Sequence, residues 1–445
     1  MIQSTVGNLD LMRKLILSFL VIPMAAQFGF SQNRLSLSDA VSIALKNSYN
    51  IQLAKNNVEI ASINNHIGVA GGLPTVTAAV NDVENITSID QKFPDPARNV
   101  TRSGVSSNNM NANLTAGILL FNGFRVKAAQ QRLAELQKMN EDMLNAQIQG
   151  TMAAVMTSYY DVVRQQNLLH TIEKSIEVSQ QRIDVIKSRK EVGLANNADL
   201  YQAQIDLNAL VQSKQAQQLI IDQGKTNLLS LLFVSPDTSV VISDSIVVDD
   251  KVTLSQIKPL ALKNPQIAAA EQQIKVNELL ERETAALRVP TLRATTGFNF
   301  TNTKSAAGFI LENRSYGPFL GVNLAIPIYN GLISKKQQQV AEINTRNAKV
   351  QRDQFLLNIE TGTVRTYQAY SNALAQLKTA KENQLLSKQL LDLVMQRFQL
   401  GQATIIDVKL AQQSFENESY RLVNLAFTAK VAEVELKRLA NIIEP

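Results

Sequence analysis

The chain has 445 residues, of which 45% are hydrophobic and 18% charged, with a formal net charge of +6. Cysteine is absent, which excludes disulfides, thiolate metal ligands, cysteine nucleophiles and a lipidated cysteine anchor. The positive charge is dispersed, without a basic block interleaved with aromatic residues, so no nucleic-acid partner is expected. The two histidines, His66 and His170, lack neighbouring ligands or carboxylates. We therefore predict no catalytic residue, metal or cofactor, and no enzyme.

The N-terminus has the layout of a secretory signal peptide, which we predict over residues 1–31. Two basic residues precede an apolar run over 15–24, and small residues lead to an expected cleavage near Ser31, with cleavage after Ala26 as the alternative. Met12 is an alternative start. The apolar run is shorter than the roughly 20 residues of a membrane-spanning helix. No later segment has such a run, so any membrane-embedded part of the mature protein is expected to be β-strand.

One sequence pattern occurs twice along the chain. The segment 37–47 recurs at 254–264, an offset of 217 residues (264 − 47). A constant offset predicts equal helix lengths, because one inserted residue would rotate every later side chain off its face. We therefore predict a first repeat over 32–234, a linker or equatorial segment over 235–252 and a second repeat over 253–442. Later matched pairs share an offset of 208 (330 − 122): Asn122 and Asn330, Arg189 and Arg397, Gly193 and Gly401, Asp199 and Asp407.

Each repeat is predicted to run helix, strand, loop, strand, very long helix, turn, helix. The segments 124–192 and 332–398 contain no proline and carry apolar residues at spacings of three and four, which is typical of a coiled coil. At 1.5 Å per residue each would extend on the order of 100 Å. Each is expected to turn, at Gly193 or Gly401, into an antiparallel hairpin. The remaining helices are expected over 36–70, 197–232, 253–288 and 405–441.

The predicted strands have period-two hydrophobicity with one apolar face. In the segment 320–328, apolar residues such as Val322 alternate with Asn323 and other polar or small residues. Polar residues opposite an apolar face suit a lipid-facing barrel around a wet lumen. The intervening segments 81–113 and 302–316 are rich in Asn, Ser, Thr and Asp, so we predict that they are exposed loops.

Four strands cannot close a barrel, because about eight is the smallest number that does. An open strand edge cannot sit in lipid, since its backbone groups would be unpaired. Two copies would give eight strands with an interior largely filled by side chains. We therefore predict a mainly α fold with a transmembrane β-barrel portion: a trimer with a 12-stranded barrel and a long α-helical coiled-coil tunnel.

Three segments carry a resemblance to a known family. The turn at 397–401 with the following 405–412, the matching segment 189–204, and the strand end at 327–331 resemble the TolC-like outer membrane efflux family. The resemblance extends over about 35–442. It implies a homotrimer in the outer membrane with its helical part in the periplasm. It also implies an exit duct for efflux or secretion that docks onto a periplasmic adaptor protein and an inner-membrane pump.

The sequence departs from the best-known relative near the second turn. Ala403 and Leu410 stand where that relative has an arginine and a second aspartate. The contacts that close the tunnel are therefore expected to differ. Two other classes remain as alternatives, namely a periplasmic coiled-coil adaptor and a structural coiled-coil protein.

The candidate site residues lie at the hairpin tips. Asp407 and Asp199 both fit helix capping, with Thr404 and Asn196 as the partner N-caps. The resemblance also implies a second role for Asp407, compatible with capping, in which three copies form an acidic ring at the tunnel mouth. The constriction candidates are Asp407, Asp199 and Phe398. The turn and adaptor-contact candidates are Arg189, Gly193, Arg397 and Gly401.

Overall fold

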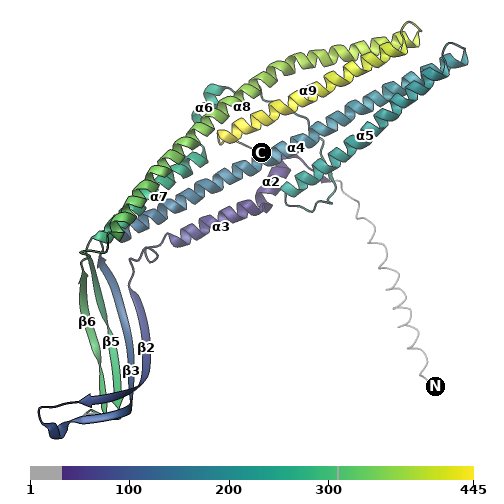
Figure 1. Ribbon diagram of the computed structural model, residues 1–445. Helices are drawn as coiled ribbons and strands as arrows, with labels where there is room; N and C mark the ends of the chain where they lie inside the picture. The colour runs from purple at the N-terminus through teal and green to yellow at the C-terminus, as the bar shows by residue number, and fades with distance from the viewer. Residues whose placement is uncertain (1–32, 308–309, 445) are drawn as a thin grey trace, which may run out of the picture.

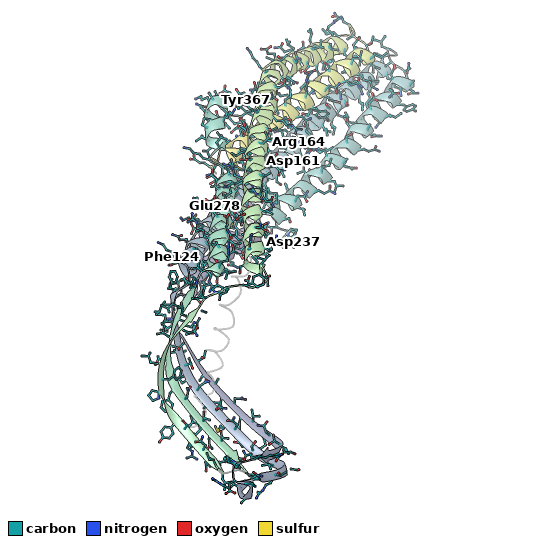
Figure 2. The ribbon with its side chains drawn as sticks, turned by 60° about the vertical axis from the view of Figure 1, so that its left-hand side comes forward. Phe124, Asp161, Arg164, Asp237, Glu278 and Tyr367 are labelled. Carbon is teal, nitrogen blue, oxygen red and sulfur yellow. The ribbon has the colours of Figure 1, made fainter. Side chains whose placement is uncertain are left out.

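The computed structural model describes residues 33–307 and 310–444. The predicted signal peptide lies outside the described residues. The molecule is elongated, with a curved sheet at one end and a wall of long helices leading away from it (Figure 1). Within the described residues, no helix is both long and apolar enough to cross a membrane.

Two antiparallel hairpins form most of the wall. They consist of α4 (Arg125–Glu191) with α5 (Asn197–Leu231), and α8 (Ile333–Gln399) with α9 (Ile405–Leu439). The long helices have 67 residues each and the return helices 35 each. The bounds agree closely with the expected ones. A proline-free segment with a sustained apolar seam is most stable as one long helix, because the helix satisfies its backbone hydrogen bonds and buries the seam.

The first helix is divided where a single helix was expected over 36–70. The structure has α2 (Leu37–Asn47) and α3 (Tyr49–Asn64), which meet at the buried Ser48. The Ser48 hydroxyl accepts the backbone N–H of Ile51 and so caps α3. The backbone of Ser48 departs from helical geometry, and its hydroxyl replaces the backbone acceptor that α3 loses at this point.

The matching helix of the second half is also divided. It consists of α6 (Leu254–Ala261) and α7 (Pro265–Ala285), followed by a short 3₁₀ turn, η2 (Ala286–Arg288). Pro265 occupies the first turn of α7, where a missing N–H costs nothing, and it disfavours helix in the residue before it. That residue, Asn264, donates to the carbonyl of Leu439 at 2.9 Å, so α7 starts where α9 ends.

The sheet has four strands in the order β2, β3, β5, β6, with every neighbouring pair antiparallel. The strands are β2 (Thr75–Gln91), β3 (Val100–Phe121), β5 (Thr291–Ser305) and β6 (Glu312–Ala325). The expectation of loops over 81–113 and 302–316 was wrong. Most of both segments is strand, and the first connection contains only a short 3₁₀ turn, η1 (Pro96–Arg98).

The polar residues of these segments pair with each other across the strands. Asn108 donates to Asp82 at 2.7 Å, and the Thr301 hydroxyl donates to Asn111 at 3.0 Å. The strand ladder uses backbone groups, which are the same in every non-proline residue. A polar composition therefore did not prevent strand pairing here.

The segment 235–252, here called the belt, packs on the helical wall between the two halves. Its strand β4 (Val240–Val241) pairs in parallel with β1 (Asn33–Arg34). The hydroxyl of Tyr159 in α4 donates to Asp244 at 2.5 Å. A second tyrosine, Tyr370 in α8, donates to the backbone carbonyl of Asp249. The belt thus ties together the long helices of both repeats.

Candidate functional site

The two hairpin tips have the same backbone geometry. Gly193 and Gly401 have φ values of 77° and 81°, in the left-handed region that residues with a Cβ rarely adopt. The N–H of the residue after each glycine, Leu194 or Gln402, bonds back to the carbonyl of Arg189 or Arg397, at 2.8 Å in both tips. This is a Schellman motif, and it explains why both turns place glycine at this position.

Each return helix starts with a capping box. Asn196 accepts the N–H of Asp199 at 2.9 Å, and Thr404 accepts the N–H of Asp407 at 3.2 Å. Both aspartates accept the N–H of their N-cap residue in return, at 3.5 Å for Asn196 and 2.8 Å for Thr404. The capping interpretation of both aspartates is therefore present in the structure, with the tighter box in the second half.

Asp407 is exposed, whereas Asp199 is half-buried. Hydrogen bonds from the backbone and hydroxyl of Thr404 lower the pKa of Asp407, and the nearby charge of Arg397 lowers it further. A single chain therefore holds Asp407 ionised and on its surface. The structure does not bring Asp407 and Asp199 into a hydrogen bond with each other, since each serves its own N-cap.

Phe398 lies inside the tip. Its side chain is 0% exposed and packs in a cluster with Ile186, Met395 and Val408 from three helices. The guanidinium of Arg189 lies 4.5 Å from the centre of its ring and donates to the Phe398 carbonyl. Phe398 thus acts at the tip by packing the two hairpins together.

A buried charge links the hairpins about three turns above the tip. Arg182 of α4 is 1% exposed, and its guanidinium lies 3.0 Å from Asp206 of α5. Lys409 of α9 reaches the other oxygen of the same carboxylate, also at 3.0 Å. Burial would raise the pKa of Asp206, but the hydrogen bond from Lys409 and the charge of Arg182 outweigh it and lower the pKa.

The sequence reasoning missed this network. Ser175, Ser179, Arg182 and Ile186 are all buried at spacings of four, three and four, so Arg182 occupies a seam position of the coiled coil. A charged residue at a seam position is the signal that could have revealed it.

The expected departures from the family pattern are visible at the second tip. Ala403 packs beside the cluster around Phe398, and Leu410 is 59% exposed. Near the tip, Arg189, Lys409 and Gln412 make hydrogen bonds between the hairpins. Among the residues that the structure describes, no group of three or more potential metal ligands occurs.

A family model described as outer membrane efflux protein matches residues 40–232 and 257–441. Protein CyaE of Bordetella pertussis is 24% identical over 282 residues, which span 62% of this chain but only 56% of CyaE. Outer membrane protein TolC of Vibrio cholerae is 23% identical over 305 residues, covering 65% of this chain and 67% of that protein.

Solved structures show the same fold at low identity. The outer membrane protein VceC of Vibrio cholerae superposes with a TM-score of 0.75 at 17% identity, covering 91% of this chain and 96% of that chain. The CmeC outer membrane channel of Campylobacter jejuni gives a TM-score of 0.73 at 15% identity, covering 91% and 85%. Both the family expectation and the location in the outer membrane are confirmed. The chain belongs to the outer membrane efflux protein family.

Proposed function

We propose that three copies of this chain form an exit duct: a 12-stranded barrel in the outer membrane continued by an α-helical tunnel in the periplasm. The duct is a passive conduit that receives its cargo from an inner-membrane pump through a periplasmic adaptor. One observation supports this proposal most directly. The sheet and the helical wall each have two open edges, one on each side, with no partner among the described residues of the same chain.

The open edges match each other. In the sheet, β2 and β6 each have one neighbour within the chain. In the wall, α3 and α5 pack on α4, α4 packs on α7 and α9, and these pack on α8. The strands alternate in direction, so β6 of one copy would lie antiparallel to β2 of the next. A head-to-tail contact of this kind closes into a ring when the rotation permits.

Apolar side chains lie exposed on the helices at both ends of the wall. On α3, Leu53, Ile60 and Ile63 are 60%, 56% and 67% exposed. On α8, Val350 and Leu357 are 66% and 64% exposed. Large apolar patches on a soluble surface favour a contact with another chain. A neighbouring copy that joins the α3 end to the α8 end would remove both patches from water.

The sheet carries an apolar band of the right height for a bilayer. On β6 the band extends over 316–325, which is about 33 Å along a strand and about 25 Å along the membrane normal at a tilt near 40°. Leu320 and Val322 are 83% and 69% exposed. At one end, Tyr316 lies beside its partner Phe300 on the neighbouring strand, as in an aromatic girdle.

A pair of neighbouring residues tests the assignment of the strand faces. Val322→Arg would place a charge on the lipid side, at a cost of about 2–4 kcal/mol per chain near the midplane. Asn323→Asp would place a charge on the lumen side, opposite Arg293. We expect Val322→Arg to abolish the heat-modifiable trimer and Asn323→Asp to preserve it. Equal tolerance at both positions would refute the barrel orientation.

The tips are the proposed adaptor contacts, with Arg189, Gly193, Arg397 and Gly401 setting their shape. Leu194 beside the first turn is 78% exposed. Because the chain has no cysteine, Leu194→Cys gives a single attachment point for cross-linking to a co-expressed adaptor. Tyr329→Cys, 78% exposed at the sheet end of α8, is the control that should not cross-link. An adaptor or filament of coiled coil alone would have no use for the apolar band.

A further inference from the structure

A hollow of about 530 Å³ lies between α4, α7 and α8. Met143 and Phe355 line it and are 54% and 46% exposed, although both are large apolar side chains. The amides of Gln266 and Gln351 and the guanidinium of Arg438 also line it. Sites for drug-sized molecules are typically 300–1,000 Å³, mainly apolar, with a few polar groups that fix orientation. The hollow has this size and composition.

Gly150 in the middle of α4 leaves the hollow open. It lines the hollow, and a Cβ added there would meet nothing within 4 Å. Glycine inside a helix is less stable than alanine by about 1 kcal/mol, and close packing gives no reason for it here. Gly362 in the middle of α8 is equally uncrowded but is not among the residues that line this hollow. The two glycines therefore form a matched pair.

The hollow lies on the side of α4 away from the belt. Gly150 precedes Tyr159, which contacts the belt at Asp244, by nine residues (159 − 150). Nine residues are about 2.5 helical turns, so Gly150 lies on the opposite face of α4 from the Tyr159 side chain. Three belts inside a ring of twelve helices would occupy the passage. The belt side is therefore the outside of the proposed tunnel, and the hollow faces its lumen.

We propose that this hollow is a binding site in the tunnel wall for an amphipathic organic molecule of drug size, either anionic or uncharged. Its apolar body would lie on Met143 and Phe355, beside the gap at Gly150. Its polar group would meet the glutamine amides and Arg438. The proposal rests on the proposed duct, because the duct brings such molecules to this wall.

The charge of the ligand follows from Arg438. It is the one charged side chain among the residues lining the hollow. Its Nε and Nη2 each donate to Glu435 at 2.7 Å. Nη1 makes no hydrogen bond within the described residues, so it is available to a ligand oxygen. Glu435 balances the charge of Arg438 but is not among the residues that line the hollow. A cationic ligand would therefore find no lining carboxylate to pair with, and its binding would be weaker than that of an anionic or uncharged molecule.

The absence of tryptophan from the chain makes the test specific. In Phe355→Trp, the new indole is the only tryptophan and lies in the hollow. It is 22 residues (355 − 333) into α8, or about 33 Å along the helix from the end near the sheet. The probe is 1-anilinonaphthalene-8-sulfonate, an aromatic anion that accepts energy from tryptophan. With the trimer in nanodiscs, we expect saturable energy transfer.

The paired glycine variants decide the assignment. In the Phe355→Trp background, Gly150→Leu should fill the hollow and weaken probe binding at least tenfold. Gly362→Leu makes the same change in the other long helix, and it should leave binding within twofold. Non-saturating transfer, or the same result for both leucine variants, would overturn the proposed site.

A second variant keeps the test valid if Gly150→Leu does not assemble. Met143→Asp changes an exposed position, so the fold should persist, and its charge should repel the anionic probe and weaken binding at least fivefold. Unchanged binding would overturn the proposal. Conductance of the same trimers in planar bilayers separates the two proposals: a conducting trimer without probe binding refutes the site alone. Probe binding by a trimer that does not conduct refutes the duct.

Discussion

The hairpins α4–α5 and α8–α9 have tips with the same backbone, yet the chemistry above the tips differs. Both turns use a glycine at positive φ and both return helices start with a capping box. Above the tip, the first hairpin holds Arg182 and Asp206 in an ion pair. At the positions 208 residues later, the second has Leu390, which is 47% exposed, and Ser414.

This difference separates two kinds of constraint. The turn is fixed by backbone geometry, so two copies of the sequence pattern share it. The interior depends on which neighbours pack against each helix. Lys409 from the second hairpin reaches Asp206 in the first, and the carboxylate therefore connects three helices. The first hairpin thus provides the buried ion pair of Arg182 and Asp206, and the second provides Lys409, whose side chain is more exposed.

The largest expected effect comes from removing the shared carboxylate. Asp206→Ala leaves Arg182 buried without a counter-charge, which should cost about 3–5 kcal/mol of local stability. We expect strongly increased hydrogen–deuterium exchange in the first tip. Ser414→Ala, at the matched position of the second hairpin, should change little. Similar exchange in both variants would contradict the asymmetry.

The same network gives a pH dependence. Because the pKa of Asp206 is lower in the folded protein, its contribution to stability is fully present above the unfolded pKa of about 3.9. The contribution is lost as the pH falls through the lower, folded value. We therefore expect the first tip to keep its protection from exchange at pH 5 and to lose it only below about pH 4.

A smaller loss of stability, of similar size in both hairpins, is expected from substitutions at the two turns. Gly193→Ala and Gly401→Ala each force a Cβ into the left-handed region, at a cost of roughly 1–2 kcal/mol. Since the φ values are 77° and 81°, both tips should lose stability by similar amounts in exchange measurements. A marked inequality would mean that side-chain packing, and not the turn, holds one of the tips.

The smallest effect on stability is expected in the second capping box, where charge and capping can be separated. Thr404→Ala removes the cap but keeps the Asp407 carboxylate, and should cost about 1 kcal/mol without changing ion preference. Asp407→Asn keeps an acceptor but removes the charge. In planar bilayers it should weaken cation selectivity and block by trivalent cations, while Asp199→Asn does less. Unchanged selectivity in Asp407→Asn would leave capping as its whole role.

The pH dependence of selectivity tests the acidic ring itself. The capping bonds lower the pKa of Asp407, whereas three carboxylates gathered on one axis would raise each other's pKa. If the capping bonds outweigh the repulsion among the three carboxylates, Asp407 stays ionised and cation selectivity should persist at pH 4.5. Loss of selectivity between pH 5 and 6 would show that repulsion among the three copies outweighs the capping bonds.

Local features were predictable from the sequence because their causes are local. The glycine turns, the capping boxes and the long helices each depend on residues within a few positions of one another. The four strands were found, but their length was not. Polar segments such as 81–113 pair through backbone groups, and composition does not reveal whether a partner strand lies alongside.

The tertiary structure alone decided the contacts between residues far apart in the chain. Phe398 was predicted as a constriction candidate from its place near the turn, but its burial among residues of α4, α8 and α9 is a tertiary contact. Arg182 and Lys409 meet at Asp206 because three helices converge there. The hollow at Gly150 likewise exists only where α4, α7 and α8 lie side by side. Periodicity determines which face of a helix is apolar, whereas the identity of its neighbour depends on how the whole chain packs.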